Sequence, residues 1–84
     1  MDNSKKAMQF LGRIIKEQRS GMQLSQTDLA NLAGLSLNFV SQIEAGKTTA
    51  QIGKVIEILH ALGMCFSLEY GKNCIISRIP EAEK

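Results

Sequence analysis

Apolar residues near the start of the chain recur with the 3.6-residue period of a helix. They include Ala7, Met8, Leu11, Ile14 and Ile15, and Gly21 follows them as a stop signal. This pattern predicts a first helix over about residues 5–20, preceded by a polar and frayed start. A second amphipathic stretch predicts a helix over about residues 51–62 that ends at Gly63. Its expected buried face consists of Ile52, Val55, Ile56, Leu59 and Leu62.

Between these helices, the chain carries the signals of a short capped helix. Ser25 is an N-cap residue, and Asp28 three positions later completes a capping box in which each side chain pairs an unsatisfied backbone donor. Gly34 can adopt the positive φ that ends a helix at no steric cost, so the chain is expected to turn there. The apolar face of this helix should comprise Leu29, Ala30, Leu32 and Ala33.

A second short helix is predicted immediately after the turn. Ser36 is its N-cap, Val40 and Ile43 anchor it from positions three residues apart, and Gly46 ends it. Its remaining side chains should point outward, and amides among them can bond base edges bidentately in a DNA major groove. This outward set consists of Leu37, Asn38, Phe39, Ser41 and Gln42.

From Met64 the apolar period changes to two, which is typical of a strand with one buried face. The pattern predicts a strand over 64–70 and a second short run over 74–79, after a glycine-containing turn at 71–73. As a hairpin, this segment would place Tyr70 opposite Cys74 and Cys65 opposite Ile79. The alternative, that the run at 74–79 pairs with another subunit, stays open. The chain therefore divides into 1–63, a helical domain, and 64–84, a strand or hairpin with a charged tail.

The two short helices resemble the helix-turn-helix domain of the Xre and phage-repressor type. The resemblance runs from Leu11 to Met64, and the residues that carry it are Ser25, Gln26, Leu29, Ala30, Gly34, Val40, Ser41, Glu44, Gly46 and Lys47. It implies an all-α fold, a compact four-helix lambda-repressor-like DNA-binding domain, here with a short C-terminal β-strand or hairpin used in dimerisation. In this family the second short helix lies in the major groove and the first braces against the DNA backbone.

Roles follow by position from that resemblance. Asn38 and Gln42 are the expected base readers, against the alternative of a merely solvated helix face. Leu37 and Phe39 depart from the polar residues usual there, and would contact thymine methyl groups or the neighbouring subunit. The expected DNA-backbone contacts are Ser25, Gln26, Ser41 and Lys47. Relatives also imply a partly buried ion pair between Arg19 and Glu44 that fixes the orientation of the second short helix.

Composition narrows the choice of partner. The 84 residues are 44% apolar with a formal net charge of +2, which is too balanced for a protein that coats polyanions, so DNA contacts must come from charge placement. A chain of this length buries only about 60–65% of its unfolded surface, which favours a dimer. The strand should supply the interface through Phe66, Leu68 and Tyr70, because a lone strand exposes an apolar edge.

Other classes of function find little support in the sequence. No nucleophile with its base and no paired-carboxylate site is present, and no cofactor is expected; the glycines fall at helix ends and turns, with Gly53 as the helical exception. Cys65, Cys74 and the single His60 do not form a metal-binding constellation, and both cysteines are expected to be reduced. His60, Lys54 and Glu57 should form a solvated face of the last helix. The sequence has neither a membrane-spanning run nor a secretory signal, which predicts a cytoplasmic protein. A DNA-binding protein in that compartment would be nucleoid-associated. The lack of a catalytic constellation predicts that the protein is not an enzyme.

The strand directly after the four helices, with the sequence LGMCFSLEY, resembles the HipB antitoxins. Those proteins repress their own operon and hold a HipA-type kinase toxin. The resemblance implies palindromic operator DNA, a second copy of the chain and a HipA-like kinase toxin as partners, and no membrane. A stand-alone Xre-type transcriptional regulator and an interaction adaptor that has lost DNA binding are the competing hypotheses.

Overall fold

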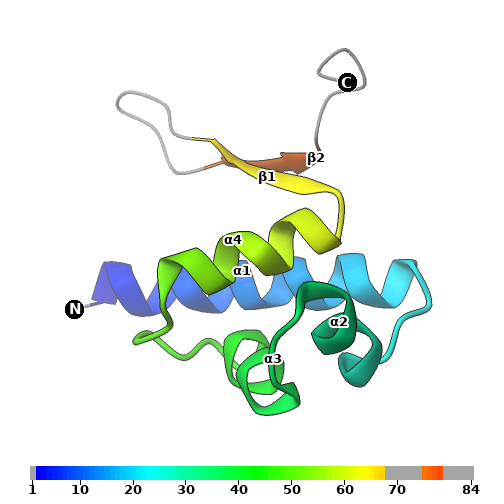
Figure 1. The fold of residues 1–84 in the computed structure, drawn as a ribbon. Coiled ribbons are helices and arrows are strands. Elements are labelled where there is room, and N and C mark those ends of the chain that lie inside the picture. The colour runs from blue at the N-terminus through cyan, green and yellow to red at the C-terminus, as the bar shows by residue number, and fades with distance from the viewer. Residues whose placement is uncertain (1, 68–74, 79–84) are drawn as a thin grey trace.

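The computed structural model describes residues 2–67 and 75–78 (Figure 1). The elements are four helices and two strands: α1 (Asp2–Gly21), α2 (Gln26–Ala33), α3 (Leu37–Glu44), α4 (Ile52–Ala61), β1 (Met64–Ser67) and β2 (Ile75–Arg78). The predicted all-α fold with a small C-terminal hairpin is thus confirmed. The prediction of a frayed start is wrong, because α1 begins at Asp2, three residues before the predicted start, and an acidic residue is favourable at the positive end of a helix.

One apolar core holds the helices together. α3 packs against α1 and α2, while α4 packs against α2 and β1. In Figure 1 the hairpin lies on one side of α4, and α2 and α3 lie on the other. A side-chain hydrogen bond from Gln18 Nε2 to the Leu62 carbonyl, 3.2 Å long, also joins α1 to the end of α4. The buried residues are Leu11, Ile15, Leu29, Ala30, Val40, Ile43, Val55, Ile58, Leu59, Leu62 and Met64.

The buried faces of α2 and α4 differ from the predicted ones. Leu32 was expected in the core but its residue surface is 61% exposed, and it lies roughly 100° around the helix from the centre of the face formed by Leu29, Ala30 and Ala33. In α4, Ile52 and Ile56 are 59% and 37% exposed, whereas Ile58, omitted from the predicted face, is fully buried. The apolar arc of α4 is wider than one core-facing stripe, so periodicity alone did not identify the inner side.

The two strands form an antiparallel hairpin within the chain. Met64 pairs with Arg78, Cys65 with Ser77 and Ser67 with Ile75. Residues 75–78 therefore pair with β1 of their own chain, but the predicted register, with Cys65 opposite Ile79, is wrong by two residues. A shift of two keeps every side chain on its face of the sheet, so the alternating pattern does not distinguish these registers. Leu68, Tyr70, Cys74 and the predicted turn at 71–73 lie outside the described residues.

Candidate nucleic-acid interface

The capped starts of α2 and α3 and the turn between the two helices form as their residues predict. The Ser25 hydroxyl accepts a hydrogen bond from the Asp28 amide and the Asp28 carboxylate accepts one from the Ser25 amide, both 2.9 Å long, which completes the capping box. Gly34 has φ +71°, a left-handed conformation that residues with a Cβ rarely adopt. The Ser36 hydroxyl then caps α3 by accepting from the Phe39 amide at 3.0 Å. The caps and the turn therefore fix where α3 begins and how its side chains are oriented.

Two glycines bring the C-terminal end of α3 against α1. Gly12 lies inside α1, where a Cβ would approach the Ile43 carbonyl oxygen to 2.5 Å and the Glu44 carbonyl oxygen to 2.8 Å. Gly46, with φ +87°, lies so close to α1 that a Cβ would come within 3.3 Å of the Gln9 Cα. The expectation that Gly53 is the one glycine inside a helix is therefore wrong. A glycine in a helix interior is a sequence signal of close backbone packing, and it marks Gly12.

A charged network ties the same end of α3 to α1 and α2. Arg19 Nε donates to Glu44 Oε2 at 2.6 Å and Arg19 Nη2 donates to Glu44 Oε1 at 3.0 Å, the bidentate geometry of a strong ion pair. Gln26 Nε2 also donates to Glu44 Oε1, at 3.0 Å. The Arg19 and Glu44 side chains are only 12% and 4% exposed. Hydrogen bonding to Glu44 raises the pKa of Arg19, which therefore stays charged.

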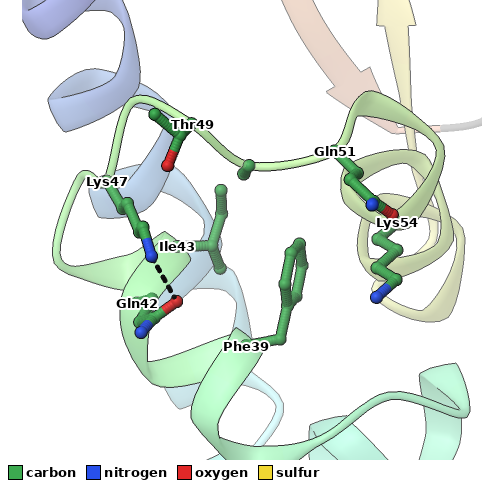
Figure 2. A pocket seen from close by; sticks show the side chains of 8 residues that line it. Phe39, Gln42, Ile43, Lys47, Thr49, Gln51 and Lys54 are labelled. Carbon is green, nitrogen blue, oxygen red and sulfur yellow. Dashed lines mark hydrogen bonds between the residues drawn. The ribbon is translucent and has the colours of Figure 1, made fainter.

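A hollow of about 200 Å³ lies beside α3, between that helix and the start of α4. Figure 2 shows Phe39 pointing from α3 towards α4, while Lys47 and Gln42 meet on the other side of the hollow. The Lys54 ammonium lies 5.7 Å from the centre of the Phe39 ring, within range of a cation–π interaction. Lys47 Nζ donates to Gln42 Oε1 at 3.1 Å. Residues lining the hollow are Phe39, Gln42, Ile43, Lys47, Thr49, Ala50, Gln51 and Lys54, which include two lysines and no acid.

The residues expected to contact DNA differ in their exposure and in their side-chain partners. Leu37, Asn38, Ser41 and Lys47 are exposed, and Gln42 is partly buried. Phe39 is partly buried against the core and points towards α4. Ser25 and Gln26 make the cap and the Glu44 contact already described. Lys54 was expected on a solvated face with Glu57 and His60; all three are exposed, but Lys54 also borders the hollow.

Comparison with known proteins identifies this architecture. A helix-turn-helix family profile matches residues 15–65, which is more than half of the chain and includes all of α2, α3 and α4. The chain belongs to the Xre-type helix-turn-helix family. It is similar to a helix-turn-helix transcriptional regulator of Sinorhizobium fredii (strain NBRC 101917 / NGR234), y4mF, itself uncharacterised, with 45% identity over 53 residues. That match covers 63% of this chain and 70% of the relative. A DNA-binding function of the helix-turn-helix regulator type follows from this membership.

Among the described residues, no three His, Cys, Asp or Glu side chains come together in a way that would hold a metal ion. Within residues 2–67 and 75–78, no helix combines the length and the apolar composition needed to cross a membrane.

Proposed function

We propose that the protein is a sequence-specific transcriptional repressor that inserts α3 into the major groove of its operator. The exposed face of α3 supports this function, because Asn38 and Ser41 point away from the core and Gln42 lies beside them. Amide side chains bond adenine or guanine edges, and the apolar Leu37 fits a thymine methyl group. Phe39, which lines the hollow, is a further proposed base contact. In such a complex, the proposed contacts to the DNA backbone are Ser25, Gln26, Ser41 and Lys47.

The distribution of charge around α3 also suits DNA. Glu44, the acid of this helix, is neutralised by Arg19 and shielded from solvent, so it places no exposed negative charge near a phosphate. Lys47 and Lys54 border the hollow with no acid among its lining residues. A net charge of +2 is compatible with DNA binding if these lysines face the DNA backbone, because local charge placement governs the contacts with phosphates.

We propose further that two copies bind a palindromic operator as a homodimer. Exposed Ile52 and Ile56 form an apolar stripe on α4, and within the described residues each strand of the two-stranded sheet has one edge without a neighbouring strand. The interface would include Phe66, which lies opposite Ile76 in the hairpin, together with Leu68 and Tyr70. Two-fold symmetry would place the two α3 helices about 34–36 Å apart, one turn of DNA.

The more specific role that we propose is that of an antitoxin which represses its own operon and holds a HipA-like kinase toxin. The layout favours it, since β1 begins at Met64, directly after the four helices. A stand-alone regulator is the competing function, and an adaptor without DNA binding is the third. Co-purification from the native operon distinguishes the first two: a kinase-like companion encoded beside this gene supports the antitoxin, and its absence supports the stand-alone regulator.

Electrophoretic retardation of DNA from upstream of the protein's own gene tests whether the protein binds that DNA specifically, as a repressor must. Specific DNA should be bound about 10³- to 10⁷-fold more tightly than unrelated DNA of equal length at the same salt concentration. Equal affinity for both fragments, or no retardation of either, would instead favour the adaptor.

A further inference from the structure

The end of α3 brings Lys47 back to Gln42 twice. The Lys47 amide donates to the Gln42 carbonyl and the Gly46 amide to the Ile43 carbonyl, each at 3.1 Å. This pair of bonds, with Gly46 at φ +87°, is the Schellman ending of a helix. The Lys47 side chain then reaches along the helix, and its Nζ donates to Gln42 Oε1 at 3.1 Å (Figure 2). The backbone ending of α3 therefore places Lys47 within reach of the Gln42 side chain.

This contact determines which way the Gln42 amide faces. A lysine ammonium can only donate hydrogen bonds, so the atom that faces Lys47 must be the amide oxygen. The amide NH₂ group, which carries two donors, is then directed away from Lys47. An amide with both groups available matches adenine, which offers the N7 acceptor and the N6 donor in the major groove. Guanine offers the acceptors N7 and O6 instead.

We propose that Lys47 sets the base preference of Gln42, so that the pair selects guanine instead of adenine. With its oxygen engaged by Lys47, Gln42 presents donors to the groove, and the ammonium adds a positive charge beside them. Both groups suit the two acceptors of guanine. The Gln42 oxygen keeps a second lone pair but is turned towards Lys47, so the N6 amino group of adenine would face the amide NH₂ donors instead. Lys47 is thus a positioning residue for specificity as well as a backbone contact. This inference rests on the proposed binding of α3 in the major groove.

The test compares operator variants that differ at single base pairs, with the dissociation constant measured for each protein. Gln42→Ala first identifies the base pair that Gln42 reads, since preference there should disappear. At that pair the wild type should prefer guanine. Lys47→Met, which keeps the apolar stem, should reduce the preference for guanine over adenine by about 2- to 12-fold, the effect of one typical hydrogen bond.

Two further variants separate positioning from a loss of charge. Lys47→Arg keeps a donor-only group and should retain much of the guanine preference. Lys47→Met combined with Gln42→Ala should show no loss of preference beyond that of Gln42→Ala alone. Independently, Lys47→Met should lower the slope of log affinity against log salt by about 1 if Lys47 also contacts a phosphate. Lys6→Ala removes the same charge from an exposed position of α1 outside the hollow, and serves as the control for that slope.

The outcomes separate this proposal from the proposed function. If Lys47→Met weakens every operator variant by the same factor while the Gln42-dependent preference stays, Lys47 does not position Gln42 and the inference is wrong, although DNA reading by α3 stands. A wild-type preference for adenine at the Gln42 pair also overturns it. If Gln42→Ala changes no base preference, Gln42 is not a base reader, and both its proposed role and this inference fail.

Discussion

Glu44 accepts hydrogen bonds from side chains of two other helices, so it connects α3 to both α1 and α2. The resemblance implied its pairing with Arg19, and the structure contains that pair in bidentate form. Gln26 was assigned to the DNA backbone from its position alone, yet it donates to the same carboxylate. Sequence position identifies which residue begins a helix but does not show which neighbour its side chain will reach.

Removal of Arg19 should destabilise the fold substantially. Arg19→Ala leaves the carboxylate of Glu44 buried without its charged partner, and the expected loss in the free energy of unfolding is about 3–5 kcal/mol. Urea unfolding measures this loss. Arg13→Ala, an exposed arginine on the same helix, should change stability by no more than about 0.5 kcal/mol. A loss below about 1 kcal/mol for Arg19→Ala would show that the pair behaves as a surface ion pair.

Gly12 should not tolerate a methyl group. Its Cβ would lie 2.5 Å from a backbone carbonyl oxygen of α3, which cannot rotate away, so Gly12→Ala should cost about 1–3 kcal/mol despite the better helix propensity of alanine. Gly53→Ala is the matched control: nothing lies within 4 Å of the added atom, and the change should stabilise α4 by up to about 1 kcal/mol. Thermal unfolding of the two variants gives the comparison, and equal effects would contradict the close packing of α1 on α3.

At the scale of elements, local signals proved sufficient for the helices and insufficient for their orientation. The caps at Ser25 and Ser36 and the glycine turn at Gly34 depend on neighbours within a few residues, so the sequence predicts them directly. The inner face of α4 depends on its contact with α2, which is distant in sequence, and on the way β1 folds back over the helix. For the same reason, Ile52 and Ile56 were assigned to the core, although the structure exposes them.

The cap of α2 predicts a pH dependence of stability. The backbone amide of Ser25, and secondarily its hydroxyl, lower the pKa of Asp28 below its ordinary value of 3.8. Because the folded pKa is below the unfolded one, the contribution of Asp28 to stability is present above about pH 4 and is lost as the pH falls through the folded pKa. Wild type and Asp28→Asn, compared by urea unfolding from pH 7 down to pH 2, should differ most at neutral pH and converge in acid. A difference that does not shrink in acid would exclude the charged cap.

For the whole molecule, the exposed stripe on α4 and the edges of the hairpin are the surfaces that the proposed dimer would cover. A change of Ile52 and Ile56 together to glutamate should shift the protein from dimer to monomer at low micromolar concentration, because charge would enter an apolar contact. Sedimentation equilibrium measures the mass. Leu32→Glu alters a leucine on α2 whose exposure, 61%, is close to the 59% of Ile52, and it should leave the dimer intact. A monomeric wild type, or a double variant that stays dimeric, would contradict this interface.

The most direct measurement of the central claim, that α3 reads DNA bases, is selection of bound sequences from random DNA by the wild-type protein and by Asn38→Ala. The wild type should enrich a pseudo-palindrome whose half-sites are about 10–10.5 base pairs apart. Asn38→Ala should enrich the same motif with preference lost at one base pair of each half-site, at a cost of about 1–3 kcal/mol in affinity for the wild-type sequence. Enrichment of no motif by the wild type, or of an unchanged motif by the variant, would contradict the account.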